Sequence, residues 1–129
     1  MTERSKEWLR QAERDLEMAR ESLGRRYYEW ACFASQQSAE KPVKALHLHF
    51  GQEVWGYVVA QLLREIPVQV DEELIDKAHV LDAFYIGARY PNGYVSGTPA
   101  EHIGKLQAEQ AVSYAGEILK FVRAEMARA

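Results

Sequence analysis

Hydrophobic residues recur every three or four positions along most of the chain, which is the period of an α-helix. In the first part of the chain these steps alternate and form one narrow apolar stripe, made by Leu9, Ala12, Leu16, Ala19 and Leu23. Ser5 precedes the stripe as a candidate N-cap. Gly24 follows it, where a left-handed residue commonly ends a helix. The pattern predicts a first helix from near Ser5 to Leu23.

The next segment, residues 28–49, predicts a second helix that another helix can approach closely. Small side chains are frequent in it, namely Ala31, Ala34, Ser35, Ser38 and Ala39. Pro42 lies inside the segment and removes the amide that would bond to the Ser38 carbonyl. We therefore expect a kink or a restart at Pro42. Gly51 ends the segment.

Three further helices are expected, separated by turn residues. The first covers residues 57–64 and is stopped by the Ile66-Pro67 pair. The second is capped by Asp71 and runs through Ile86, and the last begins at Ala100 or His102 and ends near Ala127. Core positions predicted for the last helix are Leu106, Ala111, Tyr114, Ala115, Ile118, Val122 and Met126. Residues 87–99 between these two helices form the longest irregular stretch.

The pattern thus predicts an all-α fold, an up-and-down bundle of about five helices with a kinked second helix. No alternating strand pattern and no internal repeat is present. The length of 129 residues favours one domain, residues 1–129, that is long enough to bury a core. Hydrophobic residues make up 47% and charged residues 27%, which is typical of a globular chain and not of a disordered one.

Charge and composition restrict the possible partners. The formal net charge of -3 gives no general reason to expect nucleic acid, so any cationic patch would be local. A row of Lys6, Arg10 and Arg14 fits a solvated helix face better than an RNA-binding stripe. The charged N-terminus predicts no signal peptide, and no apolar run approaches the roughly 20 residues that cross a bilayer. We expect a cytoplasmic protein that does not contact membranes.

Several standard sites are missing from the sequence. The single Cys32 cannot form an internal disulfide, and its apolar neighbours indicate a buried side chain. His47 and His49 are two residues apart and point to different sides of a helix, and His79 and His102 are isolated. The sequence has no glycine-rich phosphate loop, paired-cysteine site or nucleophile elbow. We therefore expect no metal and no cofactor.

A polar stripe crosses the second predicted helix. Phe33, Gln37, Glu40, Lys44 and His47 follow one another by steps of four and three. Glu40 and Lys44 stand in the favourable order for an ion pair four residues apart. Gln37, Glu40 and Lys44 are interpreted as a structural polar network, inside the bundle or at a subunit interface, rather than as a substrate site.

The end of the fourth helix carries the strongest candidate for ligand binding. The candidate residues are Tyr85, Arg89, Tyr90, Asn92 and Tyr94. The planar guanidinium of Arg89 can bind phosphate or carboxylate, and tyrosines can stack on a base and donate hydrogen bonds. Alternatively, Arg89 bonds to carbonyl groups at the helix end and the tyrosines close the bundle. The residues alone do not separate these two possibilities.

Two phrases of the sequence together resemble the HEPN family, helical domains named for higher eukaryotes and prokaryotes nucleotide-binding. They are Gln-Gln-x-x-Glu-Lys-x-x-Lys at residues 36–44 and Tyr-x-x-x-Arg-Tyr-Pro at residues 85–91. The resemblance covers nearly the whole chain. It implies a bundle of about five helices that commonly forms a homodimer. It also implies a minimal nucleotidyltransferase as partner, in toxin–antitoxin pairs.

The family resemblance also implies a metal-independent ribonuclease site, from which this chain departs. The family motif is an arginine, four to six variable residues and a histidine, with two copies meeting across the dimer cleft. Arg89 resembles that arginine, but the histidine positions hold Tyr94, Val95 and Ser96. Tyrosine, with a pKa near 10, is a poor base at neutral pH. His102 is farther along and is expected in the first turn of the last helix.

Three functions remain open after this departure. The first and favoured one is a binding module that holds nucleotide or RNA at Arg89 without efficient cleavage. The second is a ribonuclease toxin in which Tyr94, or the displaced His102, replaces the missing histidine. The third is a structural helical partner without a ligand. Losing acid–base assistance costs on the order of 10²–10⁴ in rate, which favours binding over cleavage.

Overall fold

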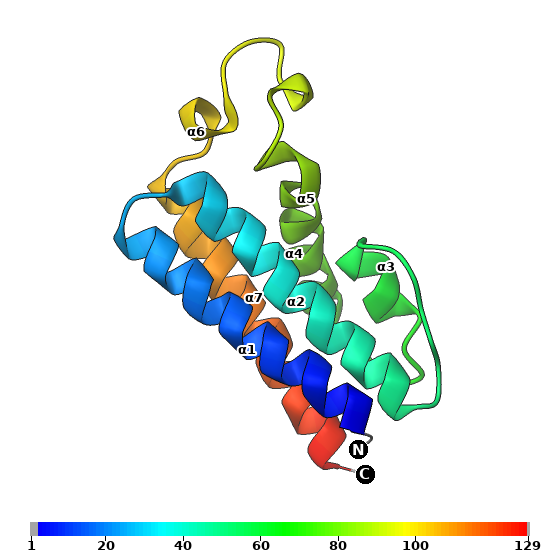
Figure 1. Ribbon diagram of the computed structural model, residues 1–129. Coiled ribbons are helices and arrows are strands. Elements are labelled where there is room, and N and C mark those ends of the chain that lie inside the picture. Colours follow the sequence, from blue (N-terminus) through cyan, green and yellow to red (C-terminus); the bar gives the residue numbers. More distant parts are fainter. Residues whose placement is uncertain (1–2, 129) are drawn as a thin grey trace.

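The computed structural model describes residues 3–128, and helices are the only regular structure in that range. In chain order they are α1 (Glu3–Gly24), α2 (Tyr28–His49), α3 (Val59–Arg64), α4 (Glu72–Asp82), α5 (Phe84–Gly87), the short 3-10 helix η1 (Pro91–Gly93), α6 (Pro99–His102) and α7 (Lys105–Ala127). Helices α1 and α4 run in one direction, and α2 and α7 run in the other (Figure 1). The predicted all-α, up-and-down bundle is confirmed.

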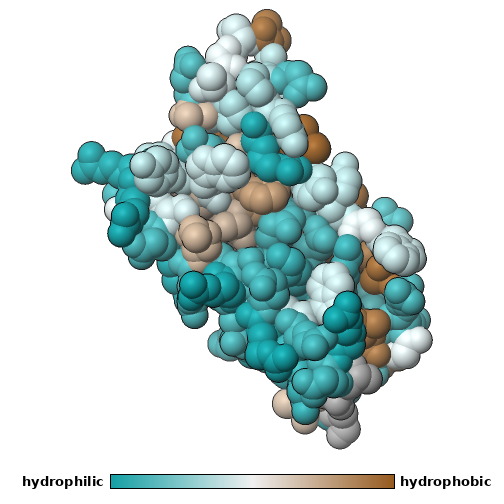
Figure 2. All heavy atoms as spheres, in the orientation of Figure 1, coloured by the Kyte–Doolittle hydropathy of each residue, from teal (hydrophilic) through white to brown (hydrophobic). Residues whose placement is uncertain are grey.

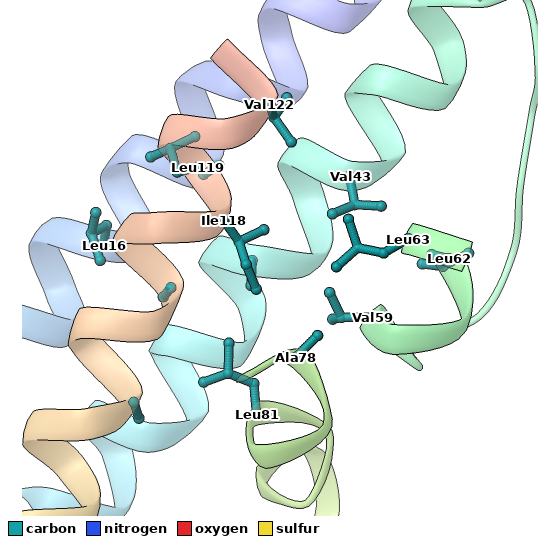
Figure 3. Packing of buried hydrophobic residues seen from close by; sticks show 14 of the residues in the cluster. Leu16, Val43, Val59, Leu62, Leu63, Ala78, Leu81, Ile118, Leu119 and Val122 are labelled. Atoms are coloured by element: carbon teal, nitrogen blue, oxygen red, sulfur yellow. The ribbon is translucent and has the colours of Figure 1, made fainter. Parts of the chain in front are cut away.

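The hydrophobic core lies where the four longer helices and α3 face one another. Side chains from α1, α2, α3, α4 and α7 converge there (Figure 3). The largest fully buried apolar side chains include Leu46, Leu63, Leu81, Ile118 and Leu119. Burying one such leucine or isoleucine contributes about 1.5–3 kcal/mol, so this cluster is the main source of stability.

Small residues bring α1 and α2 together over their length. Ala12 and Ala19 of α1 are fully buried, as are Ala31 and Ala39 of α2. Ser35 lies between the two alanines of α2 and donates its hydroxyl to the Ala31 carbonyl at 2.7 Å, so its burial leaves no polar group unpaired. The expectation that small side chains in α2 permit close packing is confirmed.

Pro42 does not interrupt α2. The chain stays helical from Tyr28 to His49, and Pro42 is among the fully buried residues of the core. The predicted restart is therefore wrong, while the kink stays a prediction. Proline has φ of about -65°, which is compatible with a helix, so Pro42 removes one hydrogen bond without ending α2.

The ends of the first helices differ from the sequence-based expectation. Helix α1 begins at Glu3, so Ser5 is buried inside the helix and is not its N-cap. Gly24 does not take the left-handed conformation; Arg26 does, with φ +68°. Gly51, with φ +75°, ends the α2 segment as predicted.

The fourth and last predicted helices are each divided. Helix α4 ends at Asp82, and after Ala83 the single turn α5 follows. The last helix begins only at Lys105, because Ile103 and Gly104 are extended and separate it from α6. Leu106 therefore lies in the first turn of α7, beyond the packed part of the bundle, and is 69% exposed instead of in the core.

Helix α3 is held against α4 by a carboxylate. Asp82 accepts hydrogen bonds from the backbone amides of Val59 at 2.6 Å and Ala60 at 3.2 Å, so it caps the N-terminus of α3 from another helix. Burial raises the pKa of Asp82 above its ordinary value, although the two amides act in the opposite direction. Asp71, the residue before α4, forms no side-chain cap bond.

The segment from Ala88 to Gly104, which contains η1 and α6, projects beyond the bundle, away from the N- and C-terminal ends of the chain (Figure 1). Its base joins α5 to α7 and passes the N-terminal end of α2. No helix within residues 3–128 has the length and apolar character needed to cross a membrane.

Candidate functional site

The backbone after α5 turns sharply and presents Arg89 beside α2. The amides of Arg89 and Tyr90 both bond to the Ile86 carbonyl, at 3.0 and 3.1 Å, and so close the helix end. Tyr90 is then extended, with φ -122° and ψ 132°, as expected for a residue before proline. These backbone hydrogen bonds fix the position of Arg89 independently of the contacts of its side chain.

The Arg89 guanidinium is surrounded by aromatic rings. Its central carbon lies 4.4 Å from the ring centroid of Phe33, 4.6 Å from that of Tyr85 and 5.0 Å from that of Tyr90. Each distance is within the range of a cation–π interaction. One ring from α2, one from α5 and the ring of Tyr90 therefore orient the guanidinium of Arg89.

The Arg89 side chain makes only one hydrogen bond within the described part of the chain. Its Nε donates to the Tyr85 carbonyl at 2.7 Å, and no carboxylate of residues 3–128 pairs with it. The structure shows the second of the two possibilities for Arg89, a bond to a carbonyl at the helix end. Its two terminal amino groups remain able to donate to an anion, so binding of a ligand stays a prediction.

The aromatic contacts continue on both sides of Arg89. Tyr57, in the segment before α3, stacks on Tyr85 with ring centroids 3.8 Å apart and planes at 9°. Trp30 contacts Phe33 edge to face, with centroids 6.2 Å apart. We call Trp30, Phe33, Tyr57, Tyr85 and Tyr90 the aromatic cluster. The cluster is assembled from parts of the chain that are distant in sequence.

Tyr94, which occupies a motif-histidine position, closes the turn after α5. Its hydroxyl donates to the Gly87 carbonyl at 2.6 Å. Because the hydroxyl proton is engaged in that bond, Tyr94 has a clear structural role. Its ring stacks on the imidazole of His102, with centroids 4.2 Å apart and planes at 3°.

His102 is brought to Tyr94 by the short helix α6. Thr98 and Glu101 form a reciprocal capping box that fixes this single turn. The His102 Nε2 lies 2.5 Å from the Ser96 carbonyl oxygen, and since a carbonyl only accepts, Nε2 carries a proton. In neutral histidine the other nitrogen, Nδ1, is then unprotonated. The expectation that His102 lies in the first turn of the last helix is wrong, because it ends α6.

Gly97 allows the close approach of this histidine. It has φ +85°, and a Cβ on it would lie 2.9 Å from His102 Nε2. A side chain at residue 97 would therefore both strain the backbone and displace the imidazole.

The remaining candidate, Asn92, is exposed in η1 and forms no hydrogen bond with Arg89 among the described residues. Of the predicted ligand-binding residues, the structure thus brings Tyr85, Arg89 and Tyr90 together and leaves Asn92 apart. No sequence signal pointed to Tyr57, because it lies 28 residues before Tyr85 and in an irregular segment.

The polar network of α2 is present and has one member that the sequence did not reveal. Lys44 pairs with Glu40 at 2.9 Å, as the spacing predicted. Gln36, fully buried, donates to Glu40 at 3.0 Å and to the Tyr57 carbonyl at 3.2 Å, and accepts from Gln37 at 2.7 Å. Through Gln36, the network holds the backbone of Tyr57, whose ring supports Tyr85.

Two other polar candidates have structural environments. His47 is buried, with its ring nitrogens 2.8 Å from the Leu62 carbonyl and 2.9 Å from Gln52. Cys32 is buried, and burial raises the pKa of its thiol to about 12. No group of three or more His, Cys, Asp or Glu side chains among residues 3–128 could hold a metal ion.

Comparison with known proteins identifies the family. The model of the HEPN domain matches residues 5–125. The chain belongs to the HEPN family. The match includes all three parts of the candidate site, which are the aromatic start of α2, the Arg89 turn and the segment that carries His102.

Solved structures of similar sequence have the same fold. TT1696 from Thermus thermophilus is 45% identical, with a TM-score of 0.93 over 95% of this chain and 98% of that one. ST0689, an archaeal HEPN homologue, is 38% identical, with a TM-score of 0.84 over 97% and 99% of the two chains. A HEPN domain protein (tm0613) from Thermotoga maritima is 36% identical, with a TM-score of 0.79 over 95% and 99%.

One curated relative carries a functional name. It is "Putative toxin MJ1304" of Methanocaldococcus jannaschii, which is 28% identical over 130 residues, 92% of this chain and 86% of that protein.

Proposed function

We propose that this HEPN protein is a cytoplasmic, homodimeric module that binds nucleotide or RNA through Arg89. We further propose that it is the toxin-side component of a toxin–antitoxin pair whose partner is a minimal nucleotidyltransferase. The dimer and that partner follow from the family resemblance. The toxin assignment is supported by the name of the archaeal relative.

The observation that carries the binding function is the environment of Arg89. Three aromatic rings surround its guanidinium, and one backbone carbonyl accepts a hydrogen bond from Nε. No carboxylate among residues 3–128 neutralises it. A pre-oriented cation with two amino groups to donate suits a phosphate, because a charge-assisted bond forms without the entropy loss of ordering the side chain.

Titration of a short single-stranded RNA against the purified protein tests this function. Arg89→Ala should weaken binding by about 10- to 150-fold, the range of a lost hydrogen bond to a charged group. Arg20→Ala, in an exposed residue of α1, is the control and should change affinity little. Equal affinity of the Arg89→Ala variant and the parent protein would contradict a phosphate site at Arg89.

A specific observation favours a second candidate, a metal-independent ribonuclease. Cleavage of RNA without metal requires a base for the 2′-hydroxyl and an acid for the leaving oxygen. His102 stacks on Tyr94, the residue at the motif position, and its Nε2 is held by Ser96 so that Nδ1 can accept a proton. In this function His102 is the acid–base residue and Arg89 binds the phosphate.

Incubation of a mixed RNA pool with EDTA separates the two candidates. If the protein is a ribonuclease, it cleaves, and both Arg89→Ala and His102→Ala lose the cleavage. If it is a binding module, the parent binds RNA without cutting. Activity that appears only in Tyr94→His would identify a ribonuclease scaffold that lacks its acid–base group.

A further inference from the structure

A groove between α1 and the first half of α2 adjoins the Arg89 site. Its volume is about 540 Å³, within the range of small-ligand sites. Its aromatic lining residues are Tyr27, Trp30 and Phe33, and its other apolar ones are Met18 and Ala34. The polar lining residues are Asp15, Ser22, Gln37 and Lys41. Pale and tan side chains gather between teal ones on this face of α1 and α2 (Figure 2).

Two aromatic side chains and one methionine of the groove are about half exposed. Tyr27 is 58% exposed and Trp30 is 49% exposed, and Met18 opposite them on α1 is 58% exposed. Large side chains that are half in contact with water and half supported by the protein are suited to stacking on a flat ligand.

Phe33 connects this groove to Arg89. Its ring lines the groove and also lies under the guanidinium, 4.4 Å from the central carbon. The edge contact between Trp30 and Phe33 extends the aromatic surface into the groove. A ligand anion on Arg89 would therefore be separated from Trp30 by the single ring of Phe33.

The polar groups of the groove suit an uncharged heterocycle and not a second anion. Lys41 is paired with Asp15 at 2.5 Å, so its charge is balanced inside the groove. Gln37 donates to Gln36, and its amide oxygen can still accept a hydrogen bond. Among the described residues that line the groove, Lys41 is the one cation and Asp15 balances it, whereas Arg89 beside Phe33 has no carboxylate partner in residues 3–128.

We propose that the groove holds a nucleobase, stacked on Trp30, of the nucleotide whose phosphate is bound by Arg89. This inference rests on the proposed function and names the part of the ligand that confers affinity beyond the phosphate. The base lies flat against aromatic rings, as in other sites for single-stranded nucleic acid, and the amide of Gln37 meets its edge.

The test compares a fluorescent octamer of oligoadenylate with an abasic octamer of the same length, by anisotropy titration. The parent protein should bind the oligoadenylate more tightly. Trp30→Ala should weaken oligoadenylate binding by about 5- to 150-fold, the range for one base–aromatic stack, and leave abasic binding unchanged. Trp30→Phe, which keeps a ring, should retain most of the difference.

Trp55→Ala is the matched control. Trp55 is 82% exposed and lies near Arg4 and Leu48, at the other end of α1 and α2. Leu48 is 18 residues from Trp30, about 27 Å along α2. This variant should bind both octamers like the parent.

The outcomes separate the inference from the function on which it rests. If Arg89→Ala weakens the binding of both octamers and Trp30→Ala weakens the binding of neither, the base site is wrong and the phosphate site stands. If the parent binds neither octamer, both proposals fail. If Trp30→Ala turns a dimer into a monomer in light scattering, a second copy covers the groove and the base site is overturned.

A titration with adenosine 5′-monophosphate distinguishes a free nucleotide from an RNA strand as the ligand. Binding that depends on Trp30 with the mononucleotide alone supports a free nucleotide as ligand. Trp30 dependence seen only with the octamer supports an RNA strand.

Discussion

Tyr85 contacts Arg89 through two different groups. Its carbonyl oxygen accepts a 2.7 Å hydrogen bond from Nε, and its ring lies 4.6 Å from the guanidinium carbon. The two contacts fix both the direction and the plane of the arginine. Tyr57 stacks on the Tyr85 ring and holds it in place.

This relationship predicts that Tyr85→Leu weakens phosphate binding without abolishing it. The substitution keeps the carbonyl and removes one of three rings over the cation, and a partly exposed cation–π contact is worth about 0.5–1 kcal/mol. We expect the Kd for a single-stranded RNA to rise about two- to fivefold. Anisotropy titration measures the change.

Tyr85→Phe is the control for this prediction, because it retains the ring and removes only the hydroxyl. Its Kd should stay close to that of the parent. A loss in Tyr85→Phe as large as in Tyr85→Leu would assign the effect to the hydroxyl and contradict the role of the ring.

The helical bundle was predictable because its signals are local. The stripe of α1 and the small residues of α2 depend on periods of three to four residues, and both give the observed packing. The Glu40–Lys44 pair was predictable for the same reason, since the two side chains are neighbours on one helix.

The errors occurred where a tertiary contact decides the outcome. Helix α4 stops at Asp82, whose carboxylate binds two amides of α3, and no local pattern reports that partner. One error had a local cause instead: His102 lies outside the last helix because Thr98 and Glu101 form a separate capping box, and this Thr-x-x-Glu pattern could have been recognised in the sequence. The sequence could anticipate the local group of Tyr85, Arg89 and Tyr90, but not that residues 30, 33 and 57 from distant parts of the chain would join it.

Gln36 is predicted to be more important for stability than its neighbour Gln37. Gln36→Leu removes the donor for both the Tyr57 carbonyl and Glu40 in a fully buried environment. A buried polar group left without its partner costs about 1–3 kcal/mol. Urea denaturation should show a loss of that size.

Gln37→Leu provides the comparison, since Gln37 is only half buried and donates to Gln36 alone. It should lose less stability than Gln36→Leu. Equal losses in the two variants would mean that the one bond from Gln37 to Gln36 matters as much as the two bonds that Gln36 donates, and the predicted order would be wrong.

Gly97→Ala is predicted to destabilise the projecting segment and to move His102. The added Cβ would lie 2.9 Å from Nε2 at a residue with φ +85°, so the imidazole must leave Ser96. Left-handed strain costs about 1–2 kcal/mol for a residue other than glycine. The chemical shifts of His102 in NMR spectra should change together with a fall in thermal stability.

Gly51→Ala isolates the backbone part of this effect. Gly51 has φ +75°, and a Cβ there would meet no atom within 4 Å. This control should show a fall in thermal stability without any change in the His102 chemical shifts. Unchanged His102 signals in Gly97→Ala would show that the histidine does not depend on Gly97 for its position.

Asp82 is predicted to reduce stability as the pH rises through the acidic range. Burial raises the folded-state pKa of Asp82 above its ordinary value of 3.8, with Glu40 adding to the rise and His79 opposing it. Below that ordinary value the carboxyl is protonated in both folded and unfolded chains. Between the ordinary and the raised value only the unfolded chain releases the proton, so increasing pH favours unfolding.

Comparison with Asp82→Asn isolates this contribution, because asparagine does not titrate while the other carboxyl groups are shared by both proteins. The free energy of unfolding of the parent minus that of the variant should fall as the pH rises from about 3 to 6. Urea denaturation at each pH measures it. A difference that grows with pH would mean that the Val59 and Ala60 amides stabilise the carboxylate more than burial penalises it. Asp82 would then be a net anionic cap of α3, and its folded-state pKa would lie below the ordinary value.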